Sequence, residues 1–234
     1  MSGHPPTPTA LIIGASRGLG LALAAEHAKR GWQVTATQRA PSASGLPALA
    51  KQWPKLLKIE TVDVTEPLQI AELKSRLIGR RFDLLFVNAG VANRRDETIG
   101  EVSTEEFFRV MHSNALGPMR VVEAFAELVP ATGTIGIMSS GLASIANNDS
   151  GGMEVYRASK AALNTLMRSF SARHPGDPRS LLLIAPGWVR TDMGGPEATL
   201  GVDDSIPRVV DTILAQTGKA GLQFLDYLGQ PVRW

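Results

Sequence analysis

The sequence predicts a single-domain α/β fold, with a doubly wound parallel sheet of about seven strands and helices on both faces. Short apolar runs alternate with longer segments of helical period through nearly all of the 234 residues. Several of these runs are apolar throughout, which is typical of parallel strands buried on both faces. No internal repeat and no Ser/Gly linker divides the chain, so strand–helix alternation continues within one domain over residues 10–234.

The first half of the alternation is marked by local signals. The first helix is expected to end at Gly31, a β-branched run (QVTATQ) predicts the second strand, and the stretch 40–49 resembles a loop. Residues 1–9 contain three prolines and are expected to form a flexible arm. The expected elements in this half are strands at 10–14, 33–38, 57–62 and 82–88, and helices at 19–30 and 67–78.

In the second half, Gly117-Pro118 predicts a kink or break within a helical region, and Pro186-Gly187 closes an apolar strand. The expected elements here are strands at 134–139, 181–185 and 222–225, and helices at 104–128, 153–173 and 205–216.

Composition excludes several classes of protein. Apolar residues make up 44% of the chain and charged residues 20%, which is typical of a globular protein. The net charge is only +2, so we expect no nucleic-acid partner. The chain has no cysteine, and its four histidines show no paired spacing, so we expect no metal site. No apolar run reaches the ~18 residues that span a bilayer, and residues 1–9 do not resemble a secretory signal. We therefore expect a cytoplasmic protein without a membrane partner.

The first strand is followed by a glycine-rich turn, Gly14-Ala15-Ser16-Arg17-Gly18-Leu19-Gly20. Residues without Cβ let a pyrophosphate approach the backbone, and the helix that follows offers free N–H groups. The spacing G-x-x-x-G-x-G differs from G-x-G-x-x-G, and no Gly-Lys-Ser/Thr follows. A turn made only for packing is the alternative. The strand-before and helix-after context favours a Rossmann-type cofactor site that includes Gly14, Ser16, Arg17, Gly18, Leu19 and Gly20.

The end of the second strand indicates which cofactor binds. An NAD site usually places Asp or Glu there, but no acidic residue occurs between Glu26 and Glu60. Arg17 and Arg39 are instead expected to converge on a 2′-phosphate, because guanidinium groups suit phosphate geometry. NADP(H) is therefore predicted in preference to NAD(H). The alternative is that both arginines are solvated surface residues.

Tyr156 and Lys160 lie four residues apart and share one helix face. A nearby ammonium is expected to lower the tyrosine pKa, which would make the phenol a proton donor or acceptor near neutrality. By itself this spacing arises often as a surface pair. Here a dinucleotide turn lies upstream, and Ser139-Ser140 ends the preceding strand.

With these motifs in order, the sequence resembles the classical short-chain dehydrogenase/reductase family from about Thr9 onward. The narrower resemblance is to the subgroup of sniffer-type carbonyl reductases and C-factor-like proteins. The resemblance implies that cofactor contacts come from the glycine turn, Asp63-Val64, Asn88-Ala89-Gly90 and Pro186-Gly187-x-Val189-x-Thr191, together with Tyr156 and Lys160.

The resemblance also implies the catalytic set Asn114, Ser140, Tyr156 and Lys160. Ser140 lies sixteen residues before Tyr156, whereas the family serine usually lies thirteen before, at the position of Ala143 here. We infer a three-residue insertion within 142–153, and Ser139 remains the alternative serine.

The implied activity is reversible hydride transfer between NADP(H) and a carbonyl or secondary alcohol. Tyr156 would be the general acid, Ser140 would polarise the substrate oxygen, Lys160 would lower the tyrosine pKa and bind the nicotinamide ribose, and Asn114 would hold a relay water. The alternative function is a dinucleotide-sensing or signalling protein without turnover.

Other predictions concern the surroundings of this site. The short region after Thr191 disfavours a sugar-nucleotide epimerase. Family analogy implies a homodimer or homotetramer. Arg94 and Arg95 are solvated in the simplest interpretation, with a role near the cofactor mouth as the alternative. Trp188 and Met193 would either wall the substrate pocket or serve packing.

Overall fold

The computed structural model describes residues 7–40 and 44–234, and in this part of the chain seven parallel strands form one sheet. The strand order is β3-β2-β1-β4-β5-β6-β7, which confirms the predicted doubly wound fold. The strands are β1 (Thr9–Ile13), β2 (Gln33–Gln38), β3 (Leu57–Thr61), β4 (Leu84–Val87), β5 (Thr134–Met138), β6 (Ser180–Ala185) and β7 (Gly221–Asp226).

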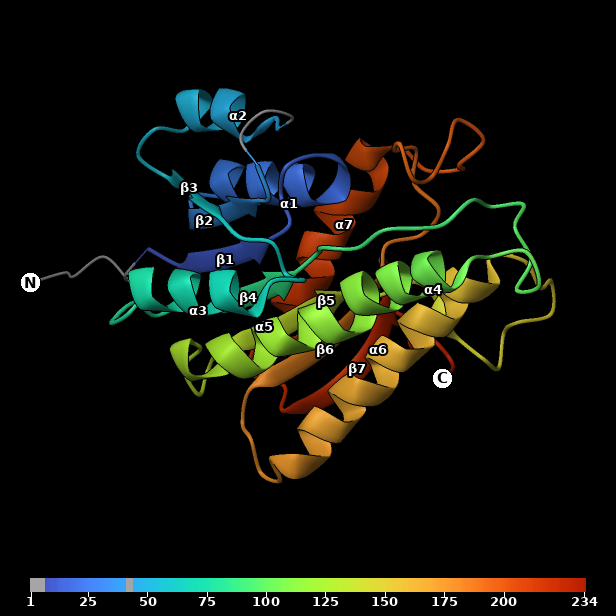
Figure 1. Ribbon diagram of the computed structural model, residues 1–234. Coiled ribbons are helices and arrows are strands. Elements are labelled where there is room, and N and C mark those ends of the chain that lie inside the picture. Colours follow the sequence, from blue (N-terminus) through green and yellow to red (C-terminus); the bar gives the residue numbers. More distant parts are fainter. Residues whose placement is uncertain (1–6, 41–43) are drawn as a thin grey trace, which may run out of the picture.

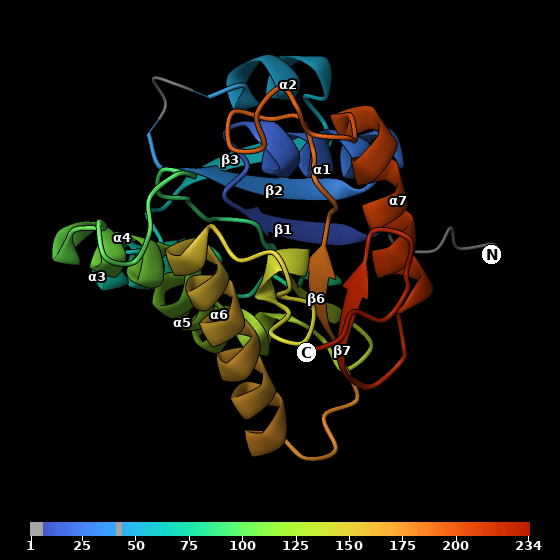
Figure 2. The same cartoon turned by 90° about the vertical axis from the view of Figure 1, so that its right-hand side faces the viewer.

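Helices cover both faces of the sheet, as Figures 1 and 2 show from two directions. One face carries α1 (Gly18–Lys29), α2 (Leu46–Gln52) and α7 (Val202–Ala215). The other carries α3 (Pro67–Arg76), α4 (Thr104–Met111), α5 (Gly117–Phe125) and α6 (Glu154–Arg173). Because strands are buried on both faces, the core divides into two apolar layers.

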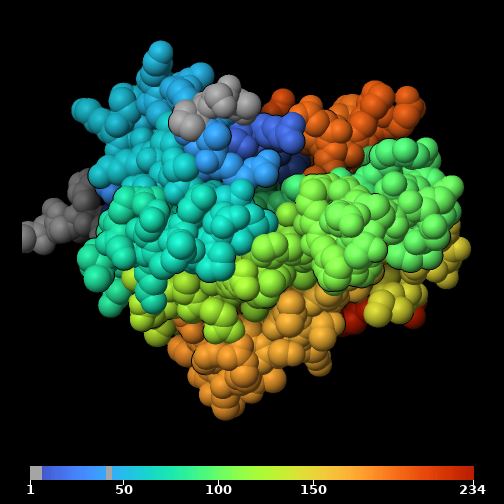
Figure 3. Space-filling model, in the orientation of Figure 1, coloured from blue at the N-terminus to red at the C-terminus, as the bar shows by residue number. Residues whose placement is uncertain are grey.

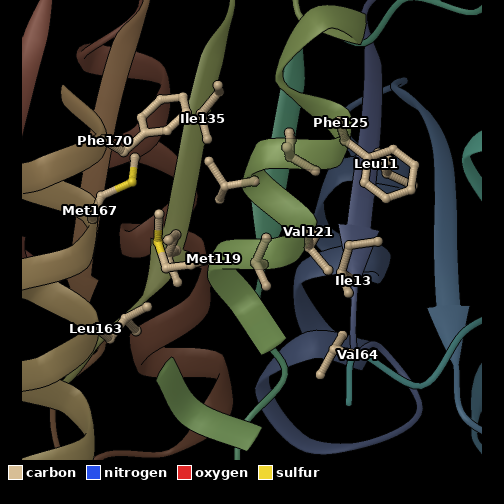
Figure 4. Close-up of a cluster of buried hydrophobic side chains, with 14 of the residues drawn as sticks. Leu11, Ile13, Val64, Met119, Val121, Phe125, Ile135, Leu163, Met167 and Phe170 are labelled. Atoms are coloured by element: carbon tan, nitrogen blue, oxygen red, sulfur yellow. The ribbon is translucent and has the colours of Figure 1, made fainter. Parts of the chain in front are cut away.

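The layer under α3, α5 and α6 is shown in Figure 4. Val121 and Phe125 of α5 lie on the side of Ile13 and Leu11, whereas Met119 lies toward Leu163 of α6. The second layer lies between the sheet and α1 and α7. Packing on both sides holds the strand ends in fixed positions, and those ends carry the site.

The strand order reverses beside β1, which pairs with β2 on one side and β4 on the other. Connections on the two sides of this point lead to helices on opposite faces, so a crevice opens at the carboxyl ends of the strands. In open α/β sheets this crevice is where ligands bind. The glycine turn after β1 and the segment after β4 both lie at this crevice.

Three elements differ from the sequence expectations. Part of the expected loop at 40–49 is helical, because α2 begins at Leu46, which is fully buried. The helical region at 104–128 breaks at Gly117-Pro118 as predicted, but the break is a π-helical turn, η2 (His112–Leu116), and the region ends in a 3-10 turn, η3 (Ala126–Leu128). A Cβ at Gly117 would lie 2.7 Å from the Val64 carbonyl oxygen, so close packing on the segment after β3 requires glycine there.

The expected arm at 1–9 is shorter at its carboxyl end. Thr9 already belongs to β1, and its backbone N–H donates to Asp83 Oδ2 at 2.8 Å. Residues 1–6 of this arm lie outside the described residues.

Candidate active site

A cleft opens at the carboxyl ends of the strands, where the predicted cofactor and catalytic motifs come together. Figure 3 shows the face on which blue and cyan N-terminal segments meet green and orange ones. The predicted residues that line the cleft are Gly14, Ser16, Arg17, Gly18, Leu19, Arg39, Asp63, Val64, Asn88, Ala89, Gly90, Tyr156, Lys160, Pro186 and Thr191.

The glycine turn is shaped by close backbone approach. Gly14 has φ +83°, and a Cβ there would lie 2.8 Å from the Ala89 backbone. A Cβ at Gly20 would lie 2.1 Å from the Gly14 carbonyl oxygen and 2.6 Å from Asn88 Nδ2. Asn88 Nδ2 donates to this same carbonyl at 2.9 Å. Any larger residue at Gly20 would therefore displace the turn. Gly20 does not line the cleft, and it packs against the turn residues that do.

The turn leads into α1, whose N-terminus faces the cleft through Gly18 and Leu19. The first turn of α1 contains no acidic residue, and no side chain in the described residues caps it at Arg17. Free N–H groups and the positive end of the helix dipole suit an anion. The cradle without Cβ atoms and this uncapped helix end fit the pyrophosphate of a dinucleotide.

Arg17 and Arg39 both line the cleft, as the expected 2′-phosphate site requires. Arg39 follows β2 and is exposed. Arg17 forms an ion pair with Asp192, with 2.8 Å between Nη1 and Oδ2, and both side chains are more than two-thirds exposed. An exposed pair of this kind contributes little to stability. The Arg17 guanidinium can therefore leave the Asp192 carboxylate and bind a ligand phosphate with little loss of folding free energy.

The predicted cofactor residue Asp63 and the predicted catalytic residue Asn114 form hydrogen bonds that shape the surroundings of the cleft. Asp63 Oδ1 accepts hydrogen bonds from the Thr65 backbone N–H and hydroxyl, at 2.9 and 2.7 Å. This turn directs Val64 into the cleft. Asn114 does not line the cleft. Its Oδ1 accepts from the Val91 N–H at 2.8 Å, and its Nδ2 donates to the Val91 carbonyl and to Ser159 Oγ.

The Asn114 side chain is thus a brace between η2, the segment after β4 and α6. Ser159 Oγ in turn donates to the Tyr156 carbonyl at 2.7 Å. The brace places Gly90 directly beside the lysine: a Cβ at Gly90 would lie 3.3 Å from both Asn114 Oδ1 and Lys160 Nζ. The relay water expected at Asn114 stays a prediction.

Tyr156 and Lys160 both face the cleft from α6. Lys160 is 3% exposed, and its Nζ donates to the Met138 carbonyl at the end of β5, at 2.9 Å. Burial lowers the pKa of Lys160 to about 8, so the ammonium is still protonated at neutrality. It lies 6.0 Å from the centre of the Tyr156 ring.

The electrostatics of Tyr156 differ from the expectation. The ring is partly exposed to the cleft, yet protein atoms surround its hydroxyl, and this burial raises the pKa of Tyr156 above its ordinary value. A hydrogen bond with Ser140 acts in the opposite direction and is the weaker effect. The expected lowering by Lys160 is not found, because at this separation the ammonium is engaged with the Met138 carbonyl. Tyr156 is therefore a protonated phenol near neutrality.

The two candidate serines point to different partners. The Ser140 side chain forms a hydrogen bond with the Tyr156 side chain, and its Oγ also accepts from the Leu142 N–H. Ser139 reaches the cleft wall but is 2% exposed, and its Oγ donates to Asn164 Oδ1 at 2.7 Å. Ala143, at the usual family position, is buried in the core. Of the two serines, Ser140 is the one bonded to Tyr156, whereas only Ser139 lines the cleft, so the role of Ser140 stays a prediction.

The segment after β6 forms the remaining wall through Pro186 and Thr191. Gly187 and Val189 do not line the cleft. Gly187 has φ +82° and packs near Tyr227, and Val189 is 4% exposed and bridges Leu200. These two residues shape the segment that presents Thr191.

Several cleft residues were missed by the sequence motifs, although they adjoin them in the chain. Val91 directly follows Asn88-Ala89-Gly90, and Asp192 directly follows Thr191, so extending each motif by one residue would have found them. The cleft residues that the sequence analysis did not name are Val62, Thr65, Val91, Ser113, Met138 and Asp192, whereas Ser139 and Met193, which it named as alternatives, also line the cleft.

Two further searches concern metals and membranes. Among the described residues, no group of three or more His, Asp or Glu side chains is arranged to hold a metal ion. Within the same residues, no helix has both the length and the apolar character needed to cross a bilayer.

Comparison with known proteins relates this site to others. Residues 8–199 match the family model for short chain dehydrogenases. The crystal structure of a short-chain dehydrogenase/reductase from Burkholderia multivorans with bound NADP is 59% identical, with TM-score 0.96, over 98% of this chain and 100% of that one.

Two more distant relatives fit the expected subgroup. The carbonyl reductase Sniffer of D. melanogaster is 31% identical, with TM-score 0.84, over 97% of this chain and 100% of that one. The C-signal protein of Myxococcus xanthus is 38% identical over 154 residues, which are 65% of this chain and 92% of the relative. The resemblance drawn from the sequence motifs is confirmed.

Proposed function

Because this chain belongs to the short-chain dehydrogenase/reductase family, we propose that it transfers hydride between NADP(H) and a carbonyl or secondary alcohol, with Tyr156 as general acid and base. The observation that carries the proposal is that Tyr156 and Lys160 line the cleft that the glycine turn enters, with Ser140 bonded to Tyr156 beside it. Bound NADP(H) would supply the hydride chemistry, and the protein would supply placement and proton transfer.

The raised pKa of Tyr156 suits the reduction direction. A neutral phenol can donate its proton to a carbonyl oxygen that gains negative charge, and general acid catalysis of this kind typically contributes ~10²–10⁴-fold. Ser140 already shares a hydrogen bond with Tyr156, so both hydroxyls can reach one substrate oxygen.

We propose that NADP(H) is preferred over NAD(H). The support is the exposed Arg39 after β2, the presence of Arg17 on the same cleft, and the lack of any acidic residue between Glu26 and Glu60. The Burkholderia multivorans relative holds NADP. The predicted homodimer or homotetramer stays a prediction.

A panel of aldehydes and ketones with NADPH, followed at 340 nm, tests the proposal. We expect turnover of at least one compound, and Tyr156→Phe should lower kcat by at least about a hundredfold while NADPH affinity stays unchanged. Tyr227→Phe is the matched control, because Tyr227 is the other tyrosine of the chain and does not line the cleft. Equal activity of Tyr156→Phe and wild type would refute the role of Tyr156.

The same panel of compounds distinguishes the enzymatic function from the alternative one. Similarity to the C-signal protein favours a dinucleotide-sensing or signalling role as second candidate. Tight NADPH binding without turnover of any compound would support that role over the enzymatic one.

A further inference from the structure

The chain segment after β6 lines the cleft and is bonded there to the segment after β4. Thr191, Asp192 and Met193 of this segment line the cleft. Arg95 comes from the segment after β4, and its Nη2 donates to the carbonyl oxygens of Met193 at 2.9 Å and Gly194 at 2.6 Å. Figure 3 shows the two segments side by side, one orange and one green.

The Arg95 guanidinium contacts a turn at 191–194 that is also held by bonds within its own segment. Its centre lies 5.6 Å from the centre of the Trp188 ring, and Trp188 Nε1 donates to the same Gly194 carbonyl at 2.8 Å. The Gly194 N–H donates to Thr191 Oγ1 at 3.0 Å, and a Cβ at Gly194 would lie 1.8 Å from the Val189 carbonyl oxygen. The turn is thus compact, and Arg95 binds its carbonyl side.

The neighbouring Arg94 makes no such contact within the described residues. It pairs with Asp96 at 3.4 Å, and both side chains are about three-quarters exposed. Both arginines lie in the same loop and carry the same charge, so Arg94 is a matched control for Arg95.

We propose that Arg95 is a positioning residue, which holds the 191–194 segment at the cleft and thereby slows the release of NADP(H). Hydrogen bonds from a charged donor are stronger than neutral ones, and here two of them join chain segments almost a hundred residues apart. The proposal rests on the proposed function for the identity of the nucleotide, but its structural half concerns contacts within the chain.

The experiment compares Arg95→Met, Arg95→Lys and Arg94→Met in the full chain with two readouts. Amide hydrogen exchange without nucleotide reports the anchor itself at Gly194 and Gly195, whose N–H groups both bond to Thr191. Stopped-flow displacement of bound NADPH by excess NADP⁺ reports the release rate.

We expect Arg95→Met to speed both exchange at these glycines and NADPH release by at least about tenfold, the effect of losing hydrogen bonds to a charged group. Arg95→Lys should be intermediate, because one ammonium retains the charge but not the two-carbonyl contact. Arg94→Met should match wild type. Unchanged exchange in the sheet strands of each variant shows that the fold is intact.

Arg95→Met that matched Arg94→Met in either readout would overturn the proposal. If Arg95→Met failed to fold, Arg95→Lys with wild-type exchange and release would also overturn it. Failure of the wild type to bind NADPH at all would instead overturn the proposed function, and this proposal with it.

Discussion

The Nζ atom of Lys160 lies 6.0 Å from the centre of the Tyr156 ring, one helical turn away on α6. Both side chains line the cleft, and the lysine is anchored there through the Met138 carbonyl. Burial shifts the two pKa values in opposite directions, lowering that of Lys160 to about 8 and raising that of Tyr156, because it disfavours both the ammonium and the phenolate. Desolvation therefore determines the protonation of the pair: the phenol keeps its proton, and the lysine titrates at about pH 8.

Lys160 should reduce stability at neutral pH. Its pKa falls from 10.5 to about 8 in the fold, so between these pH values the unfolded chain binds more protons than the folded chain. The free energy of unfolding contributed by this group therefore rises with pH across that window, by up to about 3 kcal/mol. Lys160→Met should remove this rise and abolish turnover. Urea unfolding of both proteins from pH 7 to 10 measures it, and parallel curves would contradict the burial effect.

His27 should make the protein sensitive to acid. The side chain is fully buried, and burial lowers its pKa from 6.5 to about 4, although its ring Nδ1–H donates to the Leu23 carbonyl and Glu26 lies near. Between pH 6.5 and 4 the unfolded chain binds the extra proton, so the free energy of unfolding falls as the pH falls, by about 3 kcal/mol.

His27→Phe should lose this part of the acid sensitivity while keeping a ring against Trp32. His174→Phe leaves His27 in place and serves as control. Denaturant unfolding between pH 7 and 4 would count against the prediction if wild type and His27→Phe lost stability in parallel.

Substitution of the two serines that follow β5 should have different effects, on activity at Ser140 and on stability at Ser139. Ser140→Ala should lower kcat by about a hundredfold, because it removes the hydroxyl that bonds Tyr156. Ser139→Ala should keep most activity and lower stability by about 1 kcal/mol, because its hydroxyl donates to buried Asn164. Steady-state kinetics and thermal unfolding test both, and a reversed order of activity would reassign the catalytic serine.

Arg39→Asp should shift the cofactor preference toward NADH. An acidic side chain at this position repels a 2′-phosphate and can accept hydrogen bonds from a ribose hydroxyl. Titration of NADPH and NADH should show weaker NADPH binding by at least about tenfold. Lys55→Asp makes the same charge change at an exposed residue that does not line the cleft. If Arg39→Asp behaved like Lys55→Asp, Arg39 would have no role in the choice.

Much of the fold follows from local patterns in the chain. The apolar runs at β1, β4, β5 and β6 indicated strands buried on both faces, and the order along the chain was sufficient for a doubly wound sheet. The short α2 was missed because its burial depends on packing in the layer with α1 and α7, which is not encoded in its own few residues. The π-helical turn at η2 was missed for a similar reason: its Asn114 bonds to Val91 and Ser159, from two other elements.

The sequence by itself determined the motifs whose geometry is local: the glycine turn, the Tyr156–Lys160 spacing and the absence of an acidic residue after β2. Only the tertiary structure distinguished Ser140 from Ser139, because both follow β5 and packing against α6 decides which hydroxyl meets Tyr156 and which meets Asn164. It also decided the direction of the Tyr156 pKa shift and joined Arg95 to Gly194. Desolvation and contacts between distant segments depend on how the layers pack, and no stretch of sequence contains that information.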